Sequence, residues 1–445
     1  MRALQPKYLV RLLLVLTLTL VLTGCGGDEE TSTPASGVDT ASVIHQWVSG
    51  GEPESFRAML SSWEQQTGDK AKDVGTRDIL DILAVRVAGG NPPDIAILSA
   101  PGTMEAFARE GALVALDSFL DMDKIRSEYS QAWIDLCTVD GRLYAIPGKA
   151  ANKSTVWYNP NVFETYGLEV PETWSEMLAI SDQLVAAGLS PWSLGVESGG
   201  ASGWPGTDWI GQILLSEHGP ELYDQWVDHE IPWTDPRIRS AWERFAQIFL
   251  TPDYVSGGVD YALNTNFVPA SYLPFESPPK AAMYFLGSFT QGFITGQFPD
   301  LIIEKDYSFF PFPSINPDYK NAVTGGADLL VMFNDSEASR SLVEYLATAE
   351  AQEIWVRRGG FTSLNKRVSL TSYPDGLAAK AAEQLTSAEI ARFDADDLWG
   401  GDLQAAFFQG VLDFLADPLE LDSILNNLEA VTTAFNPDRA LGSRK

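Results

Sequence analysis

The sequence predicts an α/β protein, because short apolar strands alternate with amphipathic helices from residue 43 onward. An apolar strand over 43–48 is followed by a turn at 49–51 and by a helix with apolar side chains at helical spacing. A second helix ends at 89–90, and residues 95–98 form the next apolar strand. Strands that alternate with helices predict a largely parallel sheet, whose ligand sits at the carboxyl ends of the strands. Glu52 and Ser99 closely follow two of these ends and are candidate ligand contacts.

The composition supports two domains and excludes polyanionic partners. The chain has 445 residues, of which 45% are apolar, enough to build two hydrophobic cores. Asp and Glu number 60 against 30 Lys and Arg, which gives a formal net charge of −30 at pH 7. Electrostatic repulsion therefore argues against nucleic acid or an anionic membrane surface as a partner.

The N-terminus is typical of an exported lipoprotein. Arg2, Lys7 and Arg11 precede an apolar run over 12–22, which is shorter than the ~20 residues of a spanning helix and predicts a signal peptide over 1–24. The Leu22-Thr-Gly-Cys25 sequence resembles a bacterial lipobox, so Cys25 is the predicted lipidation site, with ordinary cleavage as the alternative.

The lipidated segment after the signal peptide predicts where the protein resides. Residues 25–42 are too polar to fold and predict a flexible tether. We expect the protein in the periplasm or on the outer face of the bacterial cell membrane, held through its lipid anchor. With Cys25 lipidated, Cys137 has no partner for an intramolecular disulfide.

The segment 191–209 combines three indoles, two carboxylates and a run of glycine and serine. Indoles stack on the C–H face of a pyranose and carboxylates accept its hydroxyl protons, so this segment is interpreted as a sugar-binding loop. Trp204 is the predicted stacking platform and Asp208 the predicted hydroxyl acceptor. Asp208 could instead cap the following helix, and Trp192 and Trp209 could support the loop without touching ligand.

Metal and nucleotide sites are not expected. The histidines His45, His218 and His229 are scattered without ligand spacing, and no glycine-rich phosphate loop follows a strand. We therefore predict no cofactor and no metal, and any ATP hydrolysis must come from a separate ATPase.

The order of short motifs along the chain resembles the extracellular solute-binding proteins of ABC sugar importers, over essentially the whole mature chain. These motifs are Asn91-Pro-Pro-Asp94, Leu143-Tyr-Ala-Ile-Pro147, Trp157-Tyr-Asn-Pro160, Pro171-Glu-Thr-Trp174, Ala281-Ala-Met283, Gly287-Ser288, Gly325-Gly326 and Gly359-Gly-Phe361. Three further stretches are similar to the branch named for α-glucosides, which includes binders of glucosylated osmolytes: Gly203-Trp-Pro-Gly-Thr-Asp-Trp209, Leu222-Tyr-Asp-Gln-Trp226 and Phe275-Glu-Ser-Pro-Pro279.

This resemblance implies a two-lobed periplasmic-binding-protein-like fold of type II, with several hinge crossings between the lobes. Lobe one would comprise 43–152 and 312–362, and lobe two 153–311 and 363–445. The hinges would lie near Asn152, Pro311 and Phe361. The lobes would close on a neutral carbohydrate, and the closed monomer would deliver it to membrane permease subunits.

The resemblance also implies ligand contacts from both lobes. Phe289 stands where many relatives have a tryptophan after Gly-Ser, and Trp399 would form another aromatic wall or serve only as a helix staple. The complete predicted set of ligand contacts is Glu52, Ser99, Asn152, Lys153, Trp192, Trp204, Asp208, Trp209, Phe289, Gly326, Asp328, Phe361 and Trp399.

The competing class is a secreted glycoside hydrolase, because carboxylates and tryptophans also describe that chemistry. The whole-chain resemblance to a non-catalytic family and the predicted lipid tether favour a binding protein, and no catalytic residue is predicted. Within the same fold, the alternative ligands are a glucosylated polyol osmolyte or, less in keeping with so many indoles, a polyol, an amine or a metal.

Overall fold

The computed structural model describes residues 38–435. The predicted signal peptide, Cys25 and most of the predicted tether lie outside the described residues. The end of the tether is corrected, because β1 begins at Thr40 rather than at residue 43. Its first residues are polar, but they pair in parallel with β2 from Thr40 and Lys70 onward. Hydrogen bonding to a neighbouring strand thus extends β1 ahead of the apolar run that marks it in the sequence.

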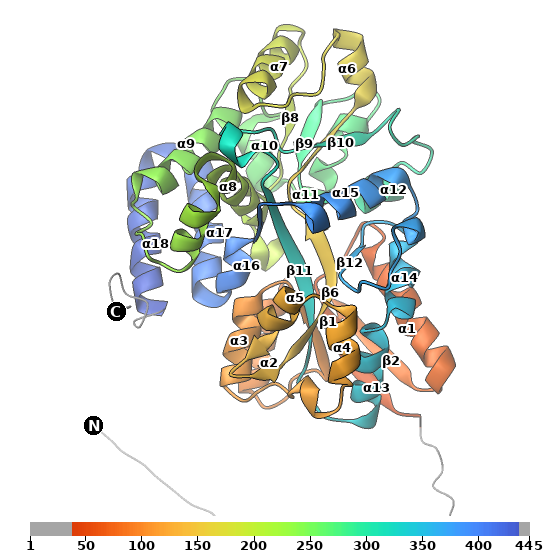
Figure 1. Cartoon of the computed structure of the whole chain (residues 1–445). Helices are drawn as coiled ribbons and strands as arrows, with labels where there is room; N and C mark the ends of the chain where they lie inside the picture. The colour runs from red at the N-terminus through yellow and green to blue at the C-terminus, as the bar shows by residue number, and fades with distance from the viewer. Residues whose placement is uncertain (1–37, 436–445) are drawn as a thin grey trace, which may run out of the picture. The chain divides into compact units, whose positions relative to one another are not determined.

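Helices account for much of the described chain (Figure 1). The α-helices are Glu52–Thr67 (α1), Ile79–Ala88 (α2), Pro101–Arg109 (α3), Met122–Glu128 (α4), Gln131–Leu136 (α5), Pro160–Tyr166 (α6), Trp174–Ala186 (α7), Trp204–Val227 (α8), Pro236–Phe249 (α9), Gly258–Asn264 (α10), Phe267–Ala270 (α11), Thr290–Gln297 (α12), Glu337–Leu346 (α13), Ala349–Val356 (α14), Gly376–Ser387 (α15), Ala395–Trp399 (α16), Gly401–Ala416 (α17) and Leu421–Phe435 (α18). Short 3₁₀ helices are Leu116–Ser118 (η1), Gly199–Ala201 (η2), Leu273–Phe275 (η3), Pro317–Tyr319 (η4), Leu370–Ser372 (η5) and Pro418–Glu420 (η6).

The strands form two main sheets and one hairpin. The larger sheet contains Thr40–His45 (β1), Lys70–Gly75 (β2), Ile95–Leu98 (β3), Ala145–Asn152 (β6), Val323–Met332 (β11), Thr362–Ser363 (β12) and Ala391–Phe393 (β13). The smaller sheet contains Thr155–Tyr158 (β7), Trp192–Ser193 (β8), Met283–Phe285 (β9) and Ser308–Pro311 (β10), and the hairpin pairs Thr138–Val139 (β4) with Arg142–Leu143 (β5).

The larger sheet is mixed, which corrects the prediction of a largely parallel sheet. Its order is β12-β6-β11-β3-β1-β2, with β13 also paired to β11. β1 is parallel to β2 and β3, as the βα units predict. β11 is antiparallel to both β3 and β6. The reason is visible in Figure 1, where β6 and β11 lie side by side and carry the chain in opposite directions between two groups of elements.

These two groups have separate hydrophobic cores. The first core draws its residues from 41–150 and 327–364. A second core draws from 156–322 and 395–428, and a smaller third core from 157–309 and 377–381. The chain leaves the first core near Asn152 and after Phe361, close to two predicted hinges. Phe312 and Ala322 still pack in the second core, so the remaining passage falls inside β11 rather than near Pro311. The residue boundaries of the two lobes stay a proposal, with this boundary moved.

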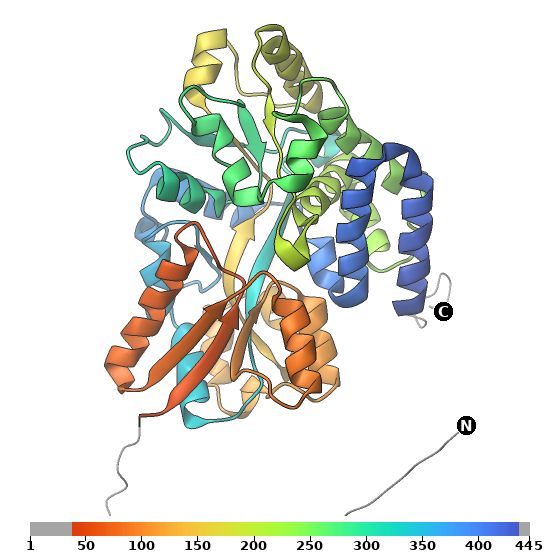
Figure 2. The ribbon, with the colours of Figure 1, turned by 180° about the vertical axis from the view of Figure 1, so that it is seen from behind.

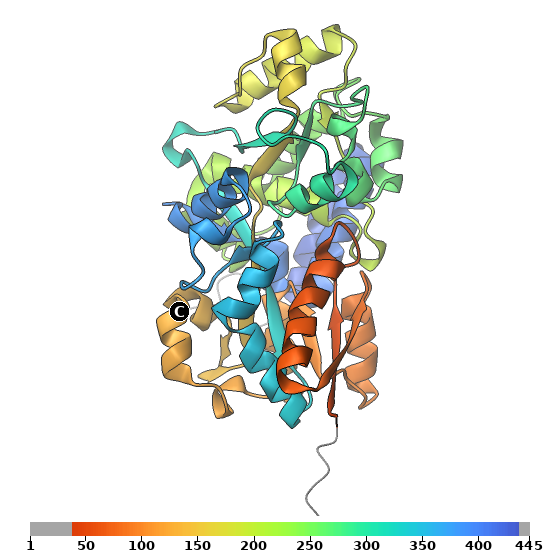
Figure 3. The same cartoon turned by 90° about the vertical axis from the view of Figure 1, so that its right-hand side faces the viewer.

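Helices cover both groups of strands. α1 packs beside α14 and α13 against the first core (Figure 3). α17 and α18 lie next to each other, and α17 also contacts α8 (Figure 2). Within residues 38–435, none of the helices combines the length and the apolar character that a membrane span requires.

Two helix starts show how local sequence shapes the fold. Thr173 and Glu176 form the predicted capping box at the start of α7, which is confirmed. α8 begins at Trp204, so residues that we expected to continue a loop form its first turn. Gly203 precedes the helix with φ of 109°, a conformation that favours glycine, and Pro205 suits the first turn.

Candidate ligand-binding site

A cavity of about 410 Å³ lies between the first core and the cores of the second group of elements. Trp47 and Phe107 of the first core line one side, and Phe267 and Phe293 of the third core line the other. Its volume falls within the range of roughly 300–1,000 Å³ that small-ligand sites occupy. The cavity is therefore the candidate ligand-binding site.

The structure brings about half of the predicted contacts together on the cavity wall. Glu52 starts α1 after β1 and Ser99 follows β3, so two strand ends of the parallel part of the sheet supply side chains to the site. The predicted contacts on the wall are Glu52, Ser99, Lys153, Trp204, Phe289, Gly326 and Asp328. A side chain at Gly326 would crowd Lys153, since an added Cβ would lie 3.0 Å from its Cε.

Three predicted aromatic contacts are core residues instead. Trp192 is fully buried and donates its indole N–H to Oγ of Ser181 at 3.1 Å. Trp209 is buried at a ring distance of 5.3 Å from Trp192, in the second core. Trp399 donates to the backbone carbonyl of Val227 at 3.0 Å. These positions agree with the alternative interpretation, in which the indoles support the fold. An indole next to a helix start can bury its large apolar area in the core without a ligand.

Asn152, Phe361 and Asp208 also lie off the cavity wall. The Asn152 amide donates to Oε1 of Gln384 at 3.0 Å and so joins β6 to α15. Phe361 packs on Trp355, with ring centroids 5.2 Å apart. Asp208 lies inside α8 rather than at its N-cap and is 2% exposed, with its carboxylate on the ammonium of Lys153 at 3.1 Å.

Several wall residues were absent from the prediction. Among them are Gln46, Trp47, Arg77, Lys149, Phe267, Phe293, Asp396, Asp397 and Gln404. Gln46 and Trp47 directly follow β1, the position that already favoured Glu52, so that signal could have identified them. The acidic run at 394–397 was a second available signal. Acidic runs are usually solvated, however, so this run alone did not indicate a ligand site.

At one part of the wall, Lys149 is paired with a single carboxylate inside an aromatic shell. Its ammonium forms an ion pair with Glu52. It also lies over the rings of Phe289, Trp355 and Trp47, at 5.2, 5.3 and 5.9 Å from their centroids. Burial raises the pKa of the Glu52 carboxyl, and the Lys149 ammonium opposes that shift. The pair and the rings together form a largely self-neutralised group.

Asp328 lies on the same wall and organises the residues after β1. Its carboxylate accepts hydrogen bonds from Nε2 of Gln46 at 2.5 Å and from Nε1 of Trp47 at 3.0 Å. Burial raises the pKa of this carboxyl, and the nearby Lys149 counteracts the shift.

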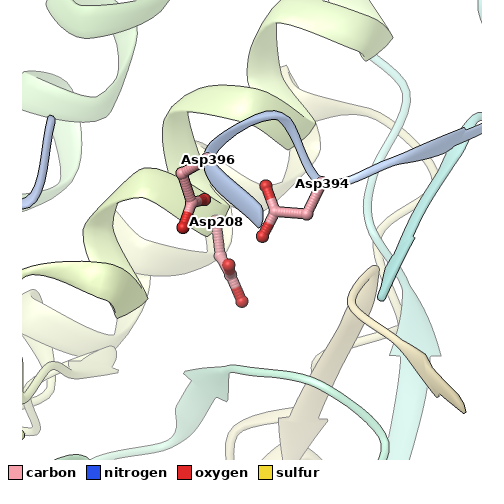
Figure 4. Close-up of side chains that lie close together, drawn as sticks. All are labelled: Asp208, Asp394 and Asp396. Atoms are coloured by element: carbon pink, nitrogen blue, oxygen red, sulfur yellow. The ribbon is translucent and has the colours of Figure 1, made fainter. Parts of the chain in front are cut away.

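At another part of the wall, Lys153 faces several carboxyl groups. Its ammonium pairs with Asp394, with Asp208 at 3.1 Å and with Asp397 at 3.2 Å. Asp396 is close enough that oxygens of Asp208, Asp394 and Asp396 lie within 4.8 Å of one another (Figure 4). All four carboxyls are at most 5% exposed. One ammonium cannot neutralise them all, so some must carry protons.

The pKa shifts of the four carboxyls follow from this imbalance. Burial raises the pKa of Asp208 and of Asp396 well above the usual range, and it raises the pKa of Asp397 to about 7. Burial also acts on Asp394, but the Lys153 ammonium and hydrogen bonds hold the pKa of that carboxyl below its usual value. Asp394 is thus the principal ionised partner of Lys153.

Oxygens of Asp208, Asp394 and Asp396 have the chemistry of ligands for a hard cation such as Ca²⁺ or Mg²⁺. However, the Lys153 ammonium contacts Asp208 and Asp394 directly. It already supplies positive charge to these oxygens, so this group is better described as a buried ion-pair cluster than as a metal centre.

Two polar atoms on the cavity wall are buried without a hydrogen-bond partner among the described residues. They are Nε1 of Trp204, a donor, and Oε1 of Gln404, an acceptor. The amide nitrogen of Gln404 is engaged, since it donates to Asp397 at 3.1 Å and to Asp396 at 3.3 Å. Buried polar groups are costly unless they are paired, so these two atoms are suited to a ligand that both donates and accepts hydrogen bonds.

Direct contacts join the two sides at the edge of the cavity. Nε of Arg77 donates to Oγ of Ser198 at 2.9 Å, and the backbone N–H of Gly200 donates to Oδ1 of Asp78 at 2.8 Å. Gly102 of α3 lies so near the backbone of Trp399 that an added Cβ would be 2.0 Å from its carbonyl oxygen. The structure therefore has a closed arrangement of the two sides.

A small-ligand cavity between two α/β cores, with contacts across its edge, is the arrangement of a solute-binding protein. The chain belongs to the bacterial extracellular solute-binding protein family, whose sequence profile matches residues 49–353. Proteins of this family are binding proteins that work with membrane permease components rather than enzymes.

Individual relatives cover most of the chain. The osmoprotective compounds-binding protein GgtB of Synechocystis sp. is 37% identical over 381 residues, which are 85% of this chain and 89% of GgtB. The α-glucosides-binding periplasmic protein AglE of Rhizobium meliloti is 33% identical over 397 residues, 86% of this chain and 85% of AglE.

A solved structure confirms the fold. The bacterial solute receptor AcbH, described as having an exclusive preference for β-D-galactopyranose, superimposes with a TM-score of 0.78 at 21% identity. The match covers 90% of this chain and all of AcbH. The two-lobed α/β fold predicted from the sequence is thus confirmed. The family and the relatives establish the sugar- or solute-binding role in an ABC transporter.

Proposed function

We propose that this protein captures an α-glucoside or a glucosylated polyol in the cavity and delivers it to the permease of its importer. The observation that carries the proposal is the cavity itself, in which the rings of Trp204 and Phe289 lie beside carboxyl and amide groups. Aromatic faces and hydrogen-bonding side chains are the two elements of a sugar site. The relation to GgtB and AglE supports both ligand classes.

Isothermal titration calorimetry tests the ligand. Purified protein without its first 37 residues is titrated with maltose, trehalose, sucrose and α-glucosylglycerol, and we expect saturable binding of at least one. Product analysis after long incubation accompanies the titration. Cleavage of any of the sugars would establish a hydrolase instead, and absence of binding by all of them would overturn the proposed ligand class.

We further propose that ligand binding closes the two lobes about the passages near residues 152, 325 and 362. The direct contacts across the cavity edge support a closed state that ligand would favour. In Gly102→Ala, the added Cβ would meet the carbonyl of Trp399 and hinder closure, whereas Gly376→Ala places a Cβ in open space and serves as the control. Small-angle scattering with saturating ligand should show a larger radius for Gly102→Ala alone; equal radii would count against closure.

The membrane attachment remains part of the proposal. Lipidation at Cys25 would tether the protein on the outer side of the membrane. In the full-length chain, Cys25→Ala should move the protein from the membrane fraction to the soluble extracytoplasmic fraction. Retention of the variant in the membrane fraction would exclude lipid at Cys25 as the anchor.

A further inference from the structure

Carboxyl groups outnumber cations on the cavity wall. The acidic side chains of the wall are Glu52, Asp78, Asp81, Asp328, Asp396, Asp397 and Asp402, and the basic ones are Arg77, Lys149 and Lys153. Behind the wall, Asp208 and Asp394 add two more buried carboxyls next to Lys153. A bound solute is therefore enclosed by more carboxyl groups than cations, and burial raises the pKa values of several of these carboxyls.

Each of the three cations already has partners within the protein. Lys149 pairs with Glu52, and Lys153 pairs with Asp208, Asp394 and Asp397. The Arg77 guanidinium donates to Ser198 at 2.9 Å and to the backbone carbonyl of Gln46 at 3.4 Å. A carboxylate or phosphate on a ligand would have to compete with these carboxylates for Lys149 and Lys153. Arg77 forms these two hydrogen bonds but no ion pair with a carboxylate among the described residues.

The unpartnered acceptor on Gln404 is a second, independent indication of which ligand groups the cavity accepts. Oε1 of Gln404 is buried and needs a hydrogen-bond donor from the ligand. A hydroxyl or an ammonium group can donate to it, whereas a carboxylate cannot. The orientation of the amide is fixed by its nitrogen, which donates to Asp396 and Asp397, so the oxygen is the atom that remains for the ligand.

The wall carboxyls themselves indicate that the cavity disfavours negative charge. Burial raises the pKa values of Glu52, Asp328 and Asp396 and raises the pKa of Asp397 to about 7. Neighbouring carboxyls add to the shift of three of them: Asp328 acts on Glu52, and Asp394 acts on both Asp396 and Asp397. An additional anion in the same cavity would raise the cost further, and a cation would lower it.

We propose that this cavity selects its ligand by charge: it accepts neutral and amine-bearing glycosides and rejects glycosides that carry a carboxylate or a phosphate. The proposal rests on the proposed function, since it concerns the ligands of that same site. Asp396, Asp397 and Gln404 are the specificity-determining residues, because they present carboxyl groups that resist further negative charge and an unpaired acceptor to the ligand.

The test is a calorimetric titration with three compounds of nearly equal size. α-Glucosylglycerol is neutral, α-glucosylglycerate has a carboxylate in place of one hydroxymethyl group, and the corresponding amino compound has an aminomethyl group there. We expect the anionic compound to bind at least about tenfold more weakly than the neutral one, since like charges in a desolvated site repel. The amino compound should bind within about threefold of the neutral one or more tightly.

The outcomes separate this inference from the proposed function. Binding of the anionic compound within about threefold of the neutral one would overturn the charge selection while leaving the sugar-binding function intact. If no neutral glucoside binds, the proposed function fails, and the amino compound then decides the inference, which falls if that compound does not bind either.

A variant locates the selectivity. In the double variant Asp396→Asn with Asp397→Asn, the ratio of neutral to anionic affinity should fall by at least about fivefold. Asp300→Asn removes one unit of charge at an exposed position outside the cavity wall and should leave the ratio unchanged. Circular dichroism verifies folding of each protein; if the double variant does not fold, the three-compound series on the unaltered protein still decides the proposal. An unchanged ratio in a folded double variant would remove these two aspartates as determinants.

Discussion

Lys149 and Lys153 lie four positions apart at the end of β6, yet their surroundings differ. Lys149 has one carboxylate partner, Glu52, and three aromatic rings around its ammonium. Lys153 has three carboxylate partners, Asp208, Asp394 and Asp397, and a fourth carboxyl, Asp396, beside them. Both ammonium groups are buried on the wall of the same cavity.

The difference teaches how a buried charge is kept in a solute cavity. A one-to-one pair with aromatic neighbours balances its own charge and leaves the rings available to a ligand. An excess of carboxyls around one cation is neutralised only by protons or by the hydrogen bonds of a ligand. The Lys149 group is thus a fixed part of the wall, and the Lys153 group is the part that responds to pH and to what is bound.

The largest expected difference is in stability. Lys153→Met leaves several buried carboxyls without their cation and should lower the free energy of unfolding by about 3–5 kcal/mol. Lys149→Met removes the ion-pair partner of Glu52, which is partly exposed, and a more distant cation from Asp328, so it should cost less. Urea unfolding at pH 8 measures both variants. A larger loss for Lys149→Met would reverse the comparison.

The pH dependence of stability distinguishes the same two groups. Burial raises the pKa of Asp397 to about 7, so the folded chain holds a proton that the unfolded chain releases near its ordinary pKa of 3.8. Its contribution to stability is therefore complete below that ordinary value and is lost as the pH rises to about 7. Asp397→Asn removes this loss, and the stability of the variant relative to the unaltered protein should rise by about 2 kcal/mol between pH 5 and pH 8.

Urea unfolding across this pH range checks the prediction for Asp397. Glu52, Asp328 and Asp396 also have raised pKa values and contribute with the same sign, while burial lowers the pKa of His45 and acts with the opposite sign. These groups are common to both proteins, so the difference between the two curves reports the loss of Asp397 together with its effect on the pKa of Asp396. Parallel curves would show that Asp397 does not carry the proton.

The sequence predicted the fold better than the site. The features that indicate the two-lobed α/β class can be identified from neighbouring residues or from the order of motifs along the chain. They are the strand–turn–helix units before residue 110, the Thr173 capping box and the motif order. The antiparallel pairing of β6 with β11 joins residues far apart in the sequence, such as Asn152 and Gly325, and no local pattern specifies it.

The site was predicted only in part, because local sequence patterns do not show which distant residues meet. Glu52 and Ser99 were predicted from strand ends, a topological rule, and both line the cavity. Trp192 and Trp209 were predicted from residue type, which does not distinguish a ligand platform from a core side chain. Asp394, Asp396 and Asp397 meet Lys153 only through the tertiary fold, across more than two hundred residues of sequence.

The aromatic rings near the two lysines should differ in their contribution to affinity. The Trp204 indole lies 5.8 Å from the ammonium of Lys153, and the Phe289 ring lies 5.2 Å from that of Lys149. Trp204 also presents an unpartnered N–H. Trp204→Ala should weaken binding by at least about tenfold, ~1.4 kcal/mol, and Phe289→Ala should have a smaller effect. Calorimetry with the tightest α-glucoside measures both, and equal losses would show that ring area alone matters.

The smallest expected effect is at the rim, where the charged groups are open to water. Asp78 precedes α2 and, instead of capping it, accepts the backbone N–H of Gly200 at 2.8 Å across the cavity edge. Because Asp78 is exposed, water competes for this bond, and Asp78→Ala should increase the rate of ligand release by roughly two- to fivefold, equivalent to about 0.5–1 kcal/mol. Asp78→Asn keeps the accepting oxygen and should release ligand at nearly the original rate. Stopped-flow fluorescence with the tightest ligand compares the two variants. If both release it equally fast, and faster than the unaltered protein, the negative charge of Asp78 matters and not its hydrogen bond. The rim would then belong with the Lys153 group as an electrostatic part of the site.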